Sequence, residues 1–149
     1  MKKVESTNIY IFKYYTLYIV LGAFAGSVMI TSKTSWQVGS NVTIECIITD
    51  GPEQTLDRIS FGLMDGSEPQ KFITVYSNSG SVIETNPWPS KWTWYQGRLS
   101  WVGDLVSKKT AFKLTKAAMN DSRTFFCGVQ WSGKFESKRA ETTILITGL

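Results

Sequence analysis

The stretch Asp121-Ser122-Arg123-Thr124-Phe125-Phe126-Cys127 decides the fold, because it describes a strand that ends on a cysteine. The only other cysteine lies in Asn41-Val42-Thr43-Ile44-Glu45-Cys46-Ile47-Ile48. In this second stretch every other residue from Val42 onward is apolar, which is the period of a strand. Two strands that each carry one cysteine predict a single disulfide between Cys46 and Cys127.

The rest of the chain divides into short strands separated by turn residues. Strands are expected at about 27–33, 42–49, 57–64, 71–76, 82–84, 97–104, 109–115, 123–130 and 142–147. Residues 85–96 are predicted to be irregular, because Pro87 and Pro89 cannot pair inside a sheet. This pattern predicts an all-β domain.

Two of these strands carry a family resemblance. The pattern D-x-x-x-[YF]-x-C at 121–127, with V-T-I-x-C upstream, resembles strands F and B of an immunoglobulin variable-type (V-set) domain. Gly97–Asp104 and Ala111–Leu114 resemble strands D and E of myelin-P0-like cell-surface domains. The resemblance implies a two-sheet, Greek-key immunoglobulin-like sandwich of the V-type over residues 26–149, with an inter-sheet disulfide. It also implies an ion pair between Arg98, which opens strand D, and Asp121, which precedes strand F.

The chain departs from that family pattern at three places. Phe125 stands where the family has the tyrosine of the tyrosine corner, and strand C carries Phe61 in place of a tryptophan. The segment before strand D is long and aromatic, with Trp88, Trp92, Trp94 and Tyr95. We expect these four rings to fill the core or cap the edge of the sandwich rather than bind a ligand.

Residues 1–25 are predicted to be a signal peptide. A basic start is followed by an apolar run, and Ala23-Phe24-Ala25 fits the small-x-small rule for cleavage after Ala25. The alternative is a signal anchor, because the charge-free segment before Lys33 has nearly the length that spans a bilayer. Either way the domain faces an oxidising compartment, secreted or on the extracellular side of the plasma membrane. The sequons at Asn41 and Asn120 predict glycosylation, more strongly at Asn41.

The composition argues against an enzyme and against nucleic-acid binding. The 149 residues include no histidine, which removes the commonest general base and metal ligand, and both cysteines are assigned to the disulfide. The twelve acidic residues are scattered, and no phosphate-binding glycine run occurs. The net charge is +4, and it falls to +2 without the leader, with no basic cluster. We expect no cofactor, no metal and no small-molecule substrate.

The resemblance therefore implies an extracellular module that binds a protein, in cell adhesion or in immune-type or self/non-self recognition. We expect the site on the sheet of strands G, F, C and C′ and on an F–G loop at 131–136. If Ile73 and Val75 fill the core, the predicted contact residues are Phe72, Tyr76, Trp131, Lys134 and Phe135, with Lys71 at the rim. Such a patch could also pair with its own copy.

Two other functions are known for V-type domains. The first, which the sequence leaves open, is a secreted, soluble binder or decoy without membrane attachment. An antigen-receptor chain is disfavoured, because Ala140-Glu141-Thr142-Thr143 stands where the joining motif F-G-x-G would lie.

Overall fold

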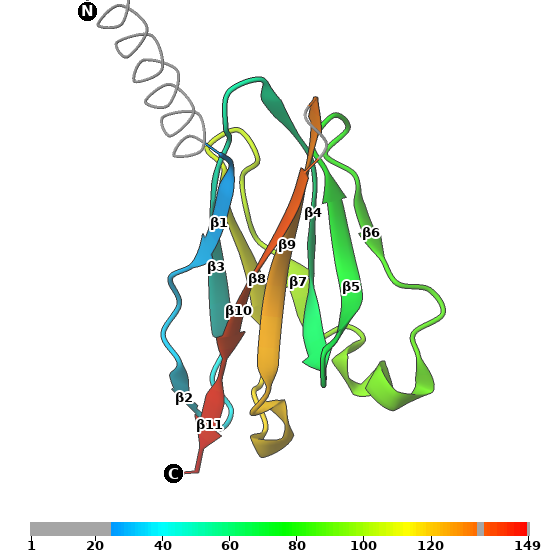
Figure 1. Cartoon of the computed structure of the whole chain (residues 1–149). Helices are drawn as coiled ribbons and strands as arrows, with labels where there is room; N and C mark the ends of the chain where they lie inside the picture. Colours follow the sequence, from blue (N-terminus) through cyan, green and yellow to red (C-terminus); the bar gives the residue numbers. More distant parts are fainter. Residues whose placement is uncertain (1–24, 134–135, 149) are drawn as a thin grey trace, which may run out of the picture.

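The computed structural model describes residues 25–133 and 136–148, which form a sandwich of two β-sheets (Figure 1). The smaller sheet has the order β1-β3-β8-β7 and the larger one β10-β9-β4-β5-β6, and β11 pairs in parallel with β2. The strands are β1 (Ser27–Ile30), β2 (Ser35–Gln37), β3 (Val42–Thr49), β4 (Gln54–Asp65), β5 (Glu68–Tyr76), β6 (Val82–Glu84), β7 (Leu99–Trp101), β8 (Lys109–Leu114), β9 (Thr124–Gly133), β10 (Glu136–Thr143) and β11 (Leu145–Thr147). Two 3-10 helices, η1 (Ser90–Tyr95) and η2 (Met119–Asp121), lie in the connections.

The core forms between the sheets from alternate residues of the strands. In β3 the buried residues are Val42, Ile44, Cys46 and Ile48, as the alternation predicts. Phe61 of β4 is fully buried and stacks on Phe112 of β8, with ring centroids 4.2 Å apart. Phe61 thus provides the aromatic centre that the strand-C tryptophan supplies in the family.

The aromatic segment before β7 completes this core, as predicted. Trp88, Trp92 and Tyr95 are buried, and 37% of Trp94 is exposed. The rings of Tyr95 and Phe125 pack in a T-shaped arrangement, at a centroid distance of 6.2 Å. The extra length of this connection therefore packs into the domain.

The strand boundaries differ from the prediction mainly at the two ends of the chain. Strand A is split into β1 and β2, because the chain leaves β3 and pairs with β11 instead. Strand F continues to Gly133 and strand G begins at Glu136, since the pair β9–β10 is antiparallel and continuous from Thr124. Residues 131–133 and 136 of the predicted F–G loop thus belong to strands.

A β-bulge in β5 decides which side chains face the core. Phe61 pairs with Ile73 but the next residue, Gly62, pairs with Lys71, so Phe72 is the extra residue on its strand. Phe72 and Ile73 are both buried as a result, although they are adjacent. The Phe72 ring lies against Trp88 and Tyr95, at centroid distances of 4.8 and 5.6 Å.

Candidate recognition face

The larger sheet turns one face to the core and the other to solvent. Because cross-strand partners share a face, the buried pairs Phe61–Cys127 and Ile59–Val129 fix the inward side of β4 and β9. The pair Ser60–Gly128, which lies between these two pairs, must then point outward. The cross-strand partners of Ser60 on β5 and of Gly128 on β10 point the same way. We call this outward surface the outer face; it carries Arg58, Ser60, Gly62, Lys71, Thr74, Tyr76, Thr124, Phe126, Gly128, Gln130, Ser137, Arg139 and Glu141.

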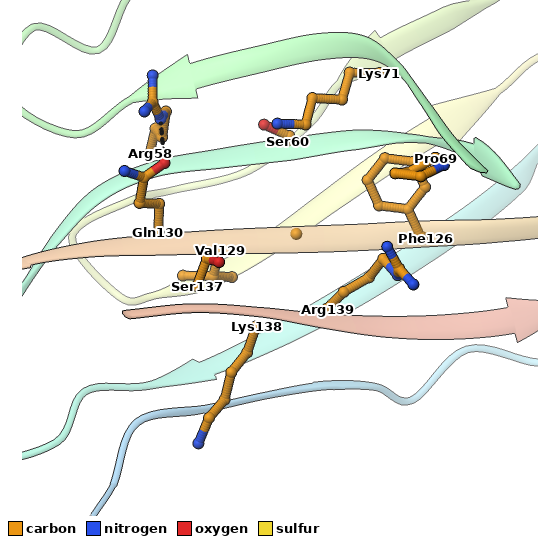
Figure 2. A pocket seen from close by; sticks show the side chains of 11 residues that line it. Arg58, Ser60, Pro69, Lys71, Phe126, Val129, Gln130, Ser137, Lys138 and Arg139 are labelled. Atoms are coloured by element: carbon orange, nitrogen blue, oxygen red, sulfur yellow. Dashed lines mark hydrogen bonds between the residues drawn. The ribbon is translucent and has the colours of Figure 1, made fainter. Parts of the chain in front are cut away.

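A hollow of about 290 Å³ lies near the middle of the outer face (Figure 2). Its depth comes from small side chains, since Ser60 and Gly128 are partners across β4 and β9. Phe126 and Pro69 line one end, and Arg58 and Gln130 line the other (Figure 2). The hollow is therefore a shallow depression with one apolar end and one polar end.

Phe126 is buried on the outer face rather than in the core. Only 1% of it is exposed, and its ring packs over Gly62 of the neighbouring strand. A Cβ at Gly62 would lie 1.7 Å from the Gln70 carbonyl oxygen and 3.0 Å from Phe126 Cε1. Glycine at 62 is thus required for the bulged strand and for Phe126 to lie flat against the sheet.

Four cationic side chains line the hollow, and three of them belong to the outer face. Arg58 Nε donates to Gln130 Oε1 at 2.9 Å and lies 3.5 Å from Asp57 Oδ2. Arg139 Nε lies 3.0 Å from Glu141 Oε1. Lys71 is exposed and has no ion-pair partner within the described residues. Lys138 also lines the hollow, but its ammonium points away and donates to the Gly26 carbonyl (Figure 2).

An ion pair between Arg98 and Asp121 lies at the end of the sandwich where η2 connects β8 to β9. Arg98 Nη2 lies 2.6 Å from Asp121 Oδ2, and the Asp121 side chain is only 1% exposed. The same guanidinium donates to the carbonyls of Thr115 and Lys116, and Asp121 Oδ2 also accepts the Ala118 N–H at 2.8 Å. Arg98 therefore joins β7 to the connection between β8 and β9.

Two titratable side chains of the core have raised pKa values. Burial, and after it the charge of Asp121, raises the pKa of Tyr95, whose hydroxyl is buried without a hydrogen-bond partner among the described residues. Burial and the neighbouring Cys46 thiol raise the pKa of Cys127. The two buried thiols lie close enough to hydrogen-bond, so the geometry brings the predicted half-cystines together.

The family is settled by a match over most of the chain. The model of the immunoglobulin V-set domain matches residues 31–147. The chain belongs to the immunoglobulin V-set family. A structure of murine CRIg shares this V-set fold at a TM-score of 0.59 and 15% identity, over 83% of this chain and 98% of that one. No curated protein sequence matches significantly. Because 2000 chains of solved structures are similar to this one, the V-set fold alone names no ligand.

Two of the five contact residues predicted from the sequence, Phe72 and Trp131, are buried. Phe72 is buried by the bulge in β5, and Trp131 is fully buried because β9 continues through it. Trp131 Nε1 donates to Asp50 Oδ1 at 2.7 Å, so Trp131 closes the core of the V-set domain. Tyr76 does lie on the outer face, half-buried beside Arg58. Lys134 and Phe135 lie outside the described residues.

Sequence reasoning missed the residues that shape and charge the hollow, namely Arg58, Ser60, Gly128 and Arg139. A signal for one of them was present. Gly128 follows the core cysteine directly, so strand alternation places it on the outer face, where a glycine leaves a depression.

The described residues contain no helix long and apolar enough to cross a membrane. Within the same ranges, no group of three histidine, cysteine, aspartate or glutamate residues could hold a metal ion.

Proposed function

We propose that this V-set domain is an extracellular recognition module that binds a protein ligand through its outer face, in adhesion or immune-type recognition. The observation that carries the proposal is the hollow on the β10-β9-β4-β5 sheet, around which polar and cationic side chains gather. Protein interfaces combine a concave or complementary centre with a polar rim, and this face offers both. The opposite sheet presents a smaller depression, of about 220 Å³.

The predicted glycans leave the outer face clear. Asn41 directly precedes β3 of the other sheet, and its Oδ1 accepts the Lys116 N–H at 3.3 Å. Asn120 is exposed in η2, at the end of the sandwich. Glycans at these two sequons would extend from the smaller sheet and from the η2 end, which supports the outer face as the surface left for a partner.

The charge of the outer face favours a partner other than a second copy. In a two-fold pairing through the hollow, the Lys71 side chains of the two copies would be brought together, with no acidic side chain among the described residues that line the hollow to offset them. Like charges opposed in an interface are costly, so we expect heterophilic binding and a monomeric domain.

The leader is proposed to be cleaved after Ala25, which would deliver the domain to the cell surface or the medium. The packing of the next residue supports this position. Gly26 is buried, and a Cβ there would lie 2.9 Å from Trp131 Cζ2. The residue after the predicted cleavage site is thus packed into the domain. Amino-terminal sequencing of the secreted protein should begin at Gly26; a start at Met1 in a membrane fraction would indicate the anchor.

The binding test uses fluorescent tetramers of residues 26–149 on a panel of cell types. Gly128→Leu should abolish staining, because its side chain would fill the hollow; a Cβ at 128 meets only ordinary contacts, the nearest at 3.6 Å, so the fold should tolerate the change. The matched control is Ala111→Leu, which fills the depression on the opposite sheet and should leave staining unchanged. Staining by Gly128→Leu equal to wild type would place the site elsewhere.

A further inference from the structure

The hollow has a charge balance that selects its ligand. Four cations line the hollow, but the Lys138 ammonium points away to the Gly26 carbonyl, Arg58 lies beside Asp57, and Arg139 is paired with Glu141. Lys71 is left without a carboxylate partner among the described residues, and no acidic side chain lines the hollow itself. The site therefore holds about one uncompensated positive charge, which a single negative charge would neutralise.

Neutral hydrogen-bonding groups stand beside that charge. Lys71 and Ser60 are neighbours on the outer face, and Ser60 Oγ lies 3.3 Å from Thr74 Oγ1 (Figure 2). Ser137 and the amide of Gln130 line the same hollow. Hydroxyl and amide donors around a cation are the groups that bind a carboxylate, because each oxygen of the anion accepts several bonds.

The other end of the hollow suits an aliphatic chain. Only 1% of Phe126 is exposed, so Pro69 supplies the accessible apolar surface there, next to the Arg139 guanidinium (Figure 2). At about 290 Å³ the hollow is at the lower limit of small-molecule pockets, so it fits one side chain and its surroundings better than a whole cofactor.

We infer that the hollow binds the carboxylate of an acidic side chain, aspartate or glutamate, presented by the protein ligand. The inference rests on the proposed function and names the chemistry of the partner's central contact. Lys71 supplies the ionic contact, Ser60 and Gln130 supply hydrogen bonds, and Pro69 contacts the methylene groups. A polyanion such as a sulfated polysaccharide is a poorer fit, because Arg58 and Arg139 already have carboxylate neighbours.

A direct test uses a short peptide as the probe. The ¹⁵N-labelled domain, residues 26–149, is titrated with acetyl-Gly-Glu-Gly-amide and with its Gln counterpart, while the amide signals of Ser60, Gly128 and Gln130 are followed by NMR. We expect the Glu peptide to shift these signals in a saturable way, and the Gln peptide to bind at least 10-fold more weakly. Equal shifts with both peptides would overturn the inference.

Charge-reversal variants give the second arm. Lys71→Glu should weaken the Glu peptide at least 10-fold, whereas Lys113→Glu, on the outside of the other sheet, should not change it. A methyl sialoside is titrated in parallel, because it also carries a carboxylate. If the sialoside binds more tightly than the Glu peptide, the inference that the carboxylate belongs to a protein side chain is wrong.

The two proposals fail separately. If Gly128→Leu abolishes tetramer staining but the Glu peptide does not bind, the carboxylate site is refuted and the outer face stands as the interface. If the peptide binds but Gly128→Leu stains cells like wild type, the carboxylate site stands and the proposed interface is refuted.

Discussion

Replacing Arg98 by alanine should destabilise the domain by about 2 to 3 kcal/mol. The substitution leaves the Asp121 carboxylate at 1% exposure with the Ala118 N–H as its remaining hydrogen bond, and it strips two backbone carbonyls of a donor. Removing one partner of a buried ion pair costs about 3 to 5 kcal/mol. We expect the lower figure because Arg98 is 25% exposed, so water can enter the vacated space and partly solvate the carboxylate.

The assay is urea unfolding of residues 26–149, followed by tryptophan fluorescence, in which the midpoint should fall at an unchanged slope. Asp121→Asn provides the near-isosteric comparison: it removes the buried negative charge and leaves the 25% exposed Arg98 guanidinium without its anion. The double variant should lose at least about 1 kcal/mol less than the sum of the single losses, because the two residues contact each other. Arg139→Ala is the control: it breaks a half-exposed pair and should cost about 0.5 kcal/mol or less. A loss from Arg98→Ala no larger than this control, or strict additivity, would refute the reasoning.

Three further predictions concern the core. Cys46 and Cys127 of the secreted protein should resist thiol labelling when the protein is unfolded without reductant, and labelling at either position would contradict the disulfide. The disulfide should stabilise the domain by about 4 kcal/mol, because it closes a loop of about 80 residues. Tyr95→Phe should change stability by less than about 1 kcal/mol at pH 7, because the hydroxyl lacks a partner among the described residues. Since burial and Asp121 raise the pKa of Tyr95, wild-type stability should fall as pH exceeds about 10, where the unfolded tyrosine ionises, and Tyr95→Phe should reduce that fall. Trp131→Phe should cost about 1 to 3 kcal/mol in thermal unfolding, because Asp50 loses the indole N–H; no loss would show that this hydrogen bond is dispensable.

The sandwich was predictable because its signals are local. The alternation at 42–48 and the cysteine-bearing strand at 121–127 are both visible within a few residues, and β3 has the predicted bounds. The position of Arg98 opposite Asp121 came from the family motif rather than from any local pattern, and the structure has this ion pair.

The contact residues were not predictable in the same way, because they depend on register between strands. A bulge inserts one residue, and in β5 it turns Phe72 inward beside Ile73, against the strict alternation expected from the sequence. Trp131 is the opposite case, since it lies an even number of residues after Phe125 and Cys127, and alternation alone would have placed it in the core. Because residues 131–136 were predicted to be a loop, the alternation of strand F was not extended to Trp131.

The parallel pairing of β2 with β11 determines how the domain would carry mechanical load. In Figure 1 the chain enters β1 at one end of the sandwich and leaves β11 at the other. A pull between these two points acts along the strands, while the hydrogen bonds of the β2–β11 ladder run across them. The ladder is therefore sheared, with all its bonds loaded together, rather than opened one bond at a time. In a domain attached by both ends, this short ladder would bear the load together with the β1–β3 pairing that precedes it along the chain.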